Sequence, residues 1–255
     1  MNFNKRNELL GMEFETNSSG KCVVVDYNGY ADISVKFYEY PCVVKCQIGR
    51  LRLGEVKNPL FPSFYNKGFI GIGDHKFTER GVSRLWNKIL VRSYCEKHLE
   101  VCPTYEDVEV CKDWLCFQNF AEWCKEQKFF KAKDEKGRSY HLDKDILVKG
   151  SKLYSPDTCC FVPQEINKLL SKRDASRGKF PMGVGFDEES GNFRARLSYF
   201  SRSKYIGSFK TVEEAFRAYK VAKEDYIKEV ANLWKDRIDD KVYQALMSYE
   251  VHIDD

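Results

Sequence analysis

The pattern of apolar and polar residues divides the chain into three regions. The first region, up to about residue 75, contains two short runs rich in β-branched residues, Lys21–Tyr27 and Ala31–Phe37, which predict β-strands. Asn28 and Gly29 lie between these runs and are typical of a two-residue hairpin turn. A third run, Cys42–Ile48, follows, so we expect a small barrel or curled sheet in residues 1–75.

Helical spacing begins in the second region, residues 76–172. Intervals of three and four residues predict a helix with one apolar face through Val82, Leu85, Trp86, Ile89 and Leu90. The same spacing from Trp114 to Cys124 predicts a second helix, and the charged stretch from Lys125 to Arg138 predicts a loop. A further helix is expected to begin at Gln164.

The third region, residues 177–255, is expected to form three strands followed by a long helix. The predicted strands are Met182–Phe186, Asn192–Tyr199 and Lys204–Phe209. Thr211 followed three residues later by Glu214 is the signature of a capping box, so the helix should begin there and continue to about Leu233. One more short helix is expected near the C-terminus, and the chain as a whole is predicted to be α+β.

Composition narrows the class of protein. Apolar residues make up 43% of the 255 residues, which is enough for folded cores and excludes a mainly disordered chain. The net charge is only +4, but 12 Lys and Arg stand against 8 Asp and Glu between Arg177 and Lys235, an excess of four. The basic excess is therefore concentrated in the third region.

Ten cysteines are present, but their spacing does not match a zinc finger. Cys42 and Cys46 are separated by three residues and have no second pair at finger spacing. The polar start, Met1–Asn7, and the lack of an apolar run near the ~18 residues of a membrane span predict neither a secretion signal nor a membrane anchor. We therefore expect reduced, mostly buried cysteines, no membrane partner and a cytoplasmic location.

Several separated motifs occur in the second region. They are KILVRSY at Lys88–Tyr94, VCKDWLCFQNFAEW at Val110–Trp123, LDKDI at Leu142–Ile146, Gly150 and YSPDTCCFVP at Tyr154–Pro163. In their order they resemble the core of the HNH, or ββα-metal, endonucleases of phages, over about residues 77–170. The resemblance implies a two-stranded ribbon and a helix that together hold one divalent ion against the scissile phosphate.

This resemblance implies roles for four side chains. Asp143 and Asn167 would ligate Mg²⁺ or another divalent metal, and His141 or Asp143 would activate water. On a strand, His141, Asp143 and Asp145 would point to the same side, and that face could hold a metal and a base. The chain departs from the family pattern in lacking a second histidine and in carrying Thr158 where the pattern has Asn. In the alternative interpretation, Asp143 and Asp145 are solvated or cap a turn.

A second group of motifs lies in the third region. They are Gly183-Val184, FRAR at Phe193–Arg196, YIGSF at Tyr205–Phe209, TVEEA at Thr211–Ala215, and Ala218-Tyr219. They resemble the APETALA/ethylene-response type of plant DNA-binding domain, in which a three-stranded sheet enters the major groove. The resemblance implies that Arg194 and Arg196 share one strand face and contact bases or phosphates, while Phe193, Ala195 and Leu197 face the helix. Further phosphate contacts are implied at Lys179, Arg202, Lys204 and Lys210.

Together, the two resemblances predict a sequence-specific endonuclease of the phage homing type that nicks or cleaves double-stranded DNA with a divalent metal. The modules would be a small β-rich module at 1–75, an HNH-like nuclease core at 76–172 and an APETALA-type domain with a helical extension at 177–255, located in the cytoplasm of a bacterial host. The alternative is a catalytically inactive DNA-binding regulator or counter-defence protein on the same scaffold. The N-terminal module would add DNA contacts or bind a host or phage protein.

Overall fold

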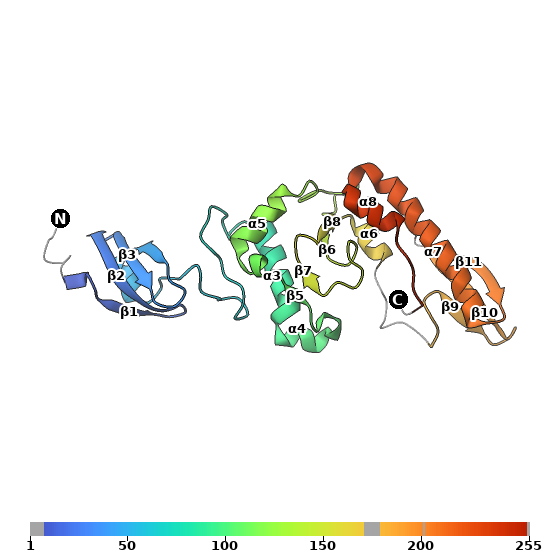
Figure 1. The fold of residues 1–255 in the computed structure, drawn as a ribbon, viewed down its shortest axis with the longest axis horizontal. Coiled ribbons are helices and arrows are strands. Elements are labelled where there is room, and N and C mark those ends of the chain that lie inside the picture. The colour runs from blue at the N-terminus through green and yellow to red at the C-terminus, as the bar shows by residue number, and fades with distance from the viewer. Residues whose placement is uncertain (1–7, 171–178, 201, 254–255) are drawn as a thin grey trace. The chain divides into compact units, whose positions relative to one another are not determined.

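The computed structural model describes residues 8–170, 179–200 and 202–253 and contains both helices and sheets, as expected for an α+β protein (Figure 1). Backbone contacts divide the chain into two compact units. The first unit comprises Met1–Glu126 and Lys152–Ser155, and the second comprises Gln127–Ser151 and Pro156–Asp255. The module boundary expected between residues 172 and 177 lies outside the described residues.

A four-stranded antiparallel sheet opens the first unit. Its strands are β1 (Glu13–Thr16), β2 (Gly20–Gly29), β3 (Asp32–Phe37) and β4 (Val43–Cys46), and they lie in this order across the sheet. The three predicted strands are confirmed. The turn predicted at Asn28-Gly29 is wrong, because β2 continues to Gly29 and the turn falls on Tyr30 and Ala31. The pairing of β2 with β3 is irregular just before Gly29. Gly29 has a φ of 143°, a conformation that favours glycine at this position.

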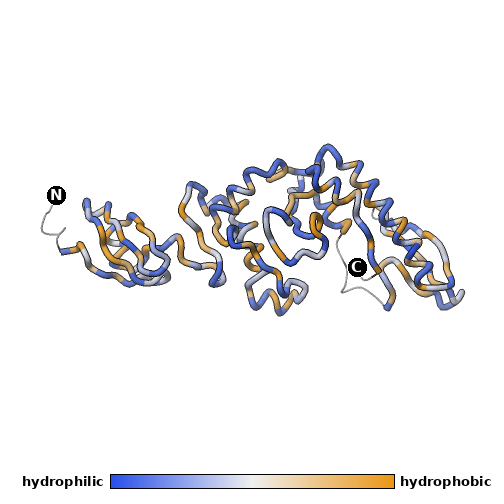
Figure 2. Tube along the Cα trace, in the orientation of Figure 1, coloured by the Kyte–Doolittle hydropathy of each residue, from blue (hydrophilic) through white to orange (hydrophobic). Residues whose placement is uncertain are grey.

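The core of this sheet module is formed on one face of the strands and on the short helix α2 (Ile48–Arg52). Its fully buried members include Cys22, Val24, Ile33, Val35, Phe37, Ile48 and Leu51. Figure 2 shows that apolar positions are distributed along the whole chain instead of gathering in one run. All ten cysteines lie within the described residues, five of them buried and five partly buried, so the prediction of mostly buried thiols is confirmed only in part.

Helices form the rest of the first unit. They are α3 (Arg80–Tyr94), α4 (Glu96–Val101) and α5 (Phe117–Glu126), with the 3₁₀ turns η1 (Pro103–Tyr105) and η2 (Lys112–Leu115) between α4 and α5. The helix predicted from Trp114 begins later, because Trp114 lies in η2 and α5 starts at Phe117. Two short strands, β5 (Glu109–Val110) and β7 (Leu153–Tyr154), pair in parallel across a long stretch of sequence.

An aromatic cluster holds α3 against α5. Trp86 is fully buried, and its indole Nε1–H donates a hydrogen bond of 2.7 Å to the carbonyl oxygen of Trp114. The ring contacts Phe64 and Phe117 edge to face, at centroid distances of 4.9 and 5.6 Å. Gly68 lies against the same ring, since a Cβ added there would be 3.0 Å from Trp86. The predicted amphipathic helix therefore buries its apolar face as expected.

The second unit contains a small two-stranded sheet followed by a short helix. Strand β6 (His141–Asp143) pairs antiparallel with β8 (Cys160–Val162), and α6 (Gln164–Leu169) follows β8 directly. Residues 127–140, which precede β6, form no helix or long strand. The charged loop predicted from Lys125 is therefore confirmed from Gln127 onward, whereas Lys125 and Glu126 end α5.

Three antiparallel strands and two helices complete the second unit. They are β9 (Val184–Asp187), β10 (Asn192–Tyr199), β11 (Arg202–Phe209), α7 (Val212–Trp234) and α8 (Asp240–Met247), with the 3₁₀ turn η4 (Lys235–Arg237) between the helices. The central strand is β10. Thr211 caps α7 in the predicted capping box with Glu214, so this helix start is confirmed.

Helix α7 packs on one face of the β9–β11 sheet. Ala215 and Tyr219 of the helix and Ala195 and Leu197 of the sheet are buried between them. Gly183, with φ +79°, lies so close to the helix that a Cβ there would be 2.0 Å from the Tyr219 ring. This position therefore requires glycine, because any side chain would collide with an aromatic ring held in the core.

Candidate nucleic-acid interface and candidate metal site

The β6–β8 sheet and α6 bring together two of the predicted site residues. His141 is the first residue of β6, and Asn167 lies on α6, which packs against this strand. Asn167 Nδ2 and His141 Nδ1 are 3.1 Å apart. An amide and an imidazole can pair in two ways, and the ring nitrogen in this contact either accepts or donates the proton. In both cases, the contact fixes the orientation of the imidazole ring.

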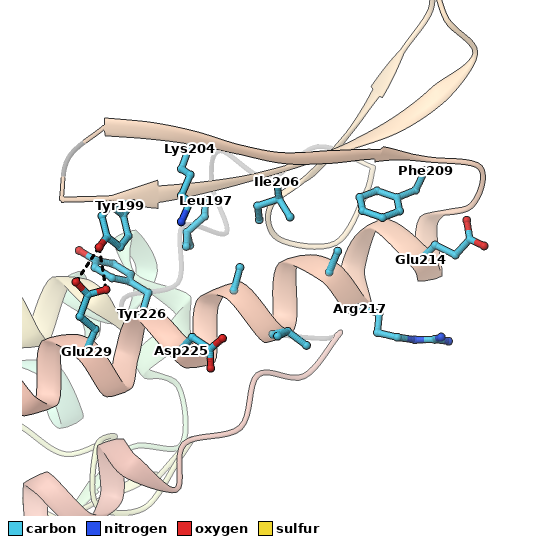
Figure 3. A pocket seen from close by; sticks show the side chains of 13 residues that line it. Leu197, Tyr199, Lys204, Ile206, Phe209, Glu214, Arg217, Asp225, Tyr226 and Glu229 are labelled. Atoms are coloured by element: carbon cyan, nitrogen blue, oxygen red, sulfur yellow. Dashed lines mark hydrogen bonds between the residues drawn. The ribbon is translucent and has the colours of Figure 1, made fainter.

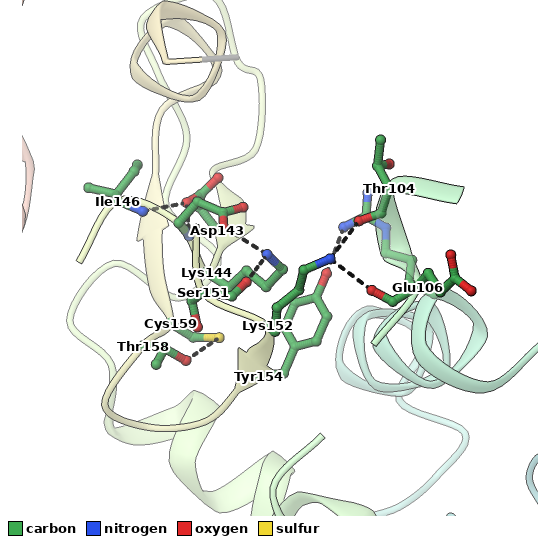
Figure 4. Close-up of polar contacts among 12 residues, drawn as sticks. Thr104, Glu106, Asp143, Lys144, Ile146, Ser151, Lys152, Tyr154, Thr158 and Cys159 are labelled. Atoms are coloured by element: carbon green, nitrogen blue, oxygen red, sulfur yellow. Dashed lines mark hydrogen bonds and ion pairs between the residues drawn. The ribbon is translucent and has the colours of Figure 1, made fainter. Parts of the chain in front are cut away.

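Asp143, the last residue of β6, forms the turn that follows the strand. Its Oδ1 accepts the backbone N–H groups of Asp145 at 2.8 Å and Ile146 at 3.0 Å (Figure 4). Burial raises the pKa of the Asp143 carboxyl above its ordinary value, and the neighbouring Asp145 adds to the increase. The predicted common strand face of three residues is wrong, because β6 ends at Asp143 and Asp145 lies beyond it.

Lys144 is a residue of this turn to which the sequence assigns no role. It is 9% exposed, and its Nζ donates hydrogen bonds to the Ser151 carbonyl oxygen and, at 2.7 Å, to Asp145 Oδ1 (Figure 4). The lysine therefore closes the loop from β6 to Ser151 and pairs with one carboxylate oxygen of Asp145. A lysine between two aspartates was the only signal for this contact in the sequence.

Thr158, at the position where the family pattern has Asn, is buried. It is 8% exposed, and its Oγ1 lies 3.8 Å from Cys159 Sγ (Figure 4). Cys160 pairs with Asp143 across the β6–β8 sheet, and burial raises the pKa of its thiol. The raised pKa keeps the Cys160 thiol protonated at neutral pH, which makes it a poor metal ligand.

The oxygen donors near His141 fit a divalent ion that keeps most of its own water. Asp143 offers a carboxylate and Asn167 an amide oxygen, the ligand types that Mg²⁺ prefers. Among the described residues, no three His, Cys, Asp or Glu side chains cluster closely enough to hold a metal ion by themselves. Because Asn167 already contacts His141, this side chain is better suited to orienting the imidazole ring than to binding the metal ion. Asp143 is therefore the principal candidate for a metal ligand.

A half-buried lysine contacts the end of the helix that carries Asn167. Lys223 of α7 donates a hydrogen bond of 2.7 Å from Nζ to the carbonyl oxygen of Leu169, the last residue of α6. Burial lowers the pKa of Lys223 from 10.5 to about 8. The lysine therefore links the position of α6 to the helix that supports the sheet.

This shift predicts a measurable pH dependence of stability. The folded state binds fewer protons at Lys223 than the unfolded state between about pH 8 and pH 10.5, so this residue makes stability rise with pH in that window. We expect the free energy of unfolding of the parent protein to increase from pH 8 to pH 10 relative to that of Lys223→Met. Urea denaturation at several pH values measures the difference, in which thiol and phenol titrations common to both proteins cancel. Parallel curves for the two proteins would contradict the assignment.

The outer face of the β9–β11 sheet, opposite α7, carries the two predicted arginines. Arg196 is exposed and lies beside Tyr205 of β11, which is 55% exposed. Arg194 forms an ion pair with Asp187 of β9. The hydrogen bond from Ser190 and this arginine lower the pKa of Asp187. In the described part of the chain, Arg196 forms no ion pair, so it is the arginine best placed to meet a polyanion.

The other predicted contacts are distributed around this sheet. Lys204 lies on the opposite face from Arg196, because it pairs with the buried Leu197 and its Nζ lies 5.0 Å from the centre of the Tyr199 ring. Figure 3 shows Lys204 pointing toward α7 into a groove of about 790 Å³. Arg202 at the start of β11 and Lys210 just after its end are exposed, and so is Lys179, which precedes β9.

The fold and these two sites define an α+β protein with a helix-backed three-stranded sheet and a ββα element that presents a paired histidine and asparagine. Comparison with models of protein families, with characterised proteins and with solved structures finds no significant match. Within residues 8–170, 179–200 and 202–253, no helix has both the length and the apolar character needed to cross a membrane.

Proposed function

We propose that this protein binds double-stranded DNA through the outer face of the β9–β11 sheet. The observation that carries the proposal is the exposed Arg196, which lies beside Tyr205 on a sheet face whose opposite side is packed on α7. A two- or three-stranded ribbon fits the major groove, where arginine recognises guanine through two hydrogen bonds. Arg194 lies on the same strand face and must exchange its partner Asp187 for DNA.

We further propose that the β6–β8 sheet and α6 form an HNH-like centre that cleaves or nicks the bound DNA. A divalent ion held by Asp143 would supply stabilisation of the developing charge on the phosphate and the leaving oxygen. In the pairing in which His141 donates its Nδ1–H to the amide oxygen of Asn167, Nε2 of the ring is unprotonated and would accept the proton of the attacking water. The resemblance of LDKDI and YSPDTCCFVP to the phage HNH endonucleases and the contact of the two side chains support this proposal.

A second candidate function is DNA binding without cleavage. Two observations favour it: Asp143 Oδ1 already accepts two backbone N–H groups, and the position of the family asparagine is a buried threonine. A protein of this kind would act as a regulator or counter-defence protein in the bacterial cytoplasm. It would bind DNA in the absence of metal, with strong salt dependence and no nicking.

Replacing both arginines tests the DNA-binding surface. We expect Arg194→Ala with Arg196→Ala to weaken binding to a duplex target selected from a random library, at about 1–3 kcal/mol per arginine, and to relax its sequence preference. Arg196→Ala alone should cost more than Arg194→Ala alone, because Asp187 competes for Arg194. Fluorescence anisotropy on the selected and scrambled duplexes measures both effects.

The matched control replaces Arg50 and Arg52 of α2 by alanine. Both arginines are exposed in the other compact unit, and the double variant loses the same charge. If the Arg194 and Arg196 double variant keeps the parent affinity and sequence preference, or if the control loses as much affinity, the β9–β11 sheet face is not the DNA-binding surface.

A further inference from the structure

The loop between α5 and β6 is a structured basic hairpin. Lys133 and Ser139 form an isolated antiparallel bridge, and the Asp134 N–H donates a hydrogen bond of 2.9 Å to the Arg138 carbonyl oxygen. Asp134 Oδ1 accepts the backbone N–H groups of Lys136 and Arg138, each at 2.9 Å. Gly137, with φ +72°, completes the turn. We call residues 127–140 the basic hairpin.

Aromatic packing fixes the base of the basic hairpin to the second unit. Phe129 stacks on Tyr140 with an interplanar angle of 16°, and Phe130 packs against Phe161 of β8 at a centroid distance of 5.5 Å. The Tyr140 hydroxyl donates a hydrogen bond of 2.9 Å to the Arg237 carbonyl oxygen. These contacts give the hairpin a defined position next to β6, which begins at the residue after Tyr140.

The exposed side chains of the basic hairpin are mainly lysines. Five Lys and Arg stand against two carboxylates in residues 127–140, a net charge of +3 against +4 for the whole chain. Both carboxylates are engaged, Asp134 by Arg138 at 2.6 Å and Glu135 by Arg237. The exposed lysines are Lys128, Lys131, Lys133 and Lys136. The hairpin therefore presents a cationic surface that its own acids do not neutralise.

Two of these lysines lie along aromatic rings. Lys128 Nζ is 5.1 Å from the centre of the Phe129 ring, and Lys131 Nζ is 5.1 Å from that of Phe130. Because the rings belong to the packed base, the lysine side chains lose part of their freedom before any ligand arrives. Prior ordering of this kind lowers the entropy cost of binding a polyanion.

We propose that the basic hairpin is a second DNA contact, which binds the phosphate backbone without reading sequence and guides the strand past His141. This inference rests on the proposed function, because it assumes duplex DNA as the partner. The basic hairpin exposes four lysines, which are point charges suited to phosphates, and its one arginine, Arg138, is paired with Asp134.

The test measures the salt dependence of binding to a scrambled duplex of about 20 base pairs. Each phosphate contact contributes about 0.9 to the slope of log Kobs against log salt. We expect Lys128→Ala, Lys133→Ala and Lys136→Ala combined to make the slope shallower by about 2 to 3, with the preference for the selected target unchanged. Lys131 is not replaced, because its backbone φ is +63°. A substitution at this left-handed position would change backbone strain as well as charge.

Two controls accompany this triple variant. Replacing Lys21, Lys36 and Lys97, which are exposed in the first unit, removes the same charge and should leave the slope within about one contact of the parent value. Lys→Arg at the three hairpin positions should retain the parent slope.

The outcomes separate the hairpin from the proposed function. A parent protein that binds duplex DNA, with an unchanged slope in the triple variant or an equal change in the charge control, would overturn the hairpin contact alone. A parent protein that binds no duplex at all would overturn the proposed function and the hairpin contact with it. A shallower salt slope in the triple variant, together with parent-like binding by the Arg194 and Arg196 double variant, would support the hairpin contact. It would also show that the β9–β11 sheet is not the DNA-binding face.

Discussion

His141→Ala should abolish metal-dependent nicking of supercoiled DNA and leave DNA binding intact. A positioned general base contributes about 10²–10⁴-fold to the rate, so the nicking rate should fall by at least about 100-fold. Asn167→Ala should cause a smaller loss, because the histidine remains while the 3.1 Å contact that orients its ring is lost. Agarose gels of plasmid incubated with Mg²⁺ or Mn²⁺ measure the rates, and anisotropy on a duplex measures binding.

His252→Ala is the matched control, since His252 is exposed near the end of the described chain. It should nick at the parent rate. Asp143→Asn separates metal binding from folding, because asparagine retains the Oδ1 acceptor for the turn N–H groups but loses the charge. Nicking by His141→Ala at the parent rate would remove this residue from the mechanism. Binding without nicking by the parent protein under either metal would favour the non-cleaving candidate.

Trp86→Ala should produce the largest loss of stability among single core changes in the first unit. The side chain is fully buried between α3 and α5, and its removal leaves a cavity and an unpaired carbonyl at Trp114. Large-to-small changes of this kind cost about 3–5 kcal/mol. Urea denaturation followed by far-UV circular dichroism measures the change.

Two further variants show which part of Trp86 stabilises the core. Trp86→Phe retains an aromatic ring but loses the indole N–H, so we expect a smaller cost of about 1–3 kcal/mol for the unmatched carbonyl and the reduced volume. Ile72→Ala changes a side chain that is 68% exposed and should be near neutral. A Trp86→Ala protein as stable as the parent would contradict the packing of α3 on α5.

Periodicity and local signals predicted most of the regular structure. The three strands of residues 184–209 follow from short runs with apolar and aromatic residues bounded by turns, and the helix follows from its capping box, Thr211 with Glu214. Both signals are local in sequence. The helix through Val82 and Trp86 follows from its apolar spacing in the same way. By contrast, the parallel pair β5–β7 joins short segments with no periodic signal, and only the tertiary fold brings them together.

The site could be predicted only in part, for two physical reasons. The approach of Asn167 to His141 depends on how α6 folds back on β6, although the motif named both residues. The face of Lys204 could not be predicted, because an irregular register between Ala195 and Arg196 leaves Ile206 without a partner. One extra residue reverses the alternation along β11 and places Lys204 on the side of the helix.

The parallel pair β5–β7 has a consequence for dividing this protein. Residues Lys152–Ser155 belong to the first compact unit, whereas the chain on both sides of them belongs to the second. The backbone therefore passes between the units three times, and no single cut separates them. A fragment that ends at Glu126 would lack β7, and the N–H groups of Glu109 and Cys111 would lose the carbonyl partners that Lys152 and Tyr154 provide. Residues 1–126 are then not a complete folding unit, so a cut within residues 127–151 should affect the first unit as well as the second.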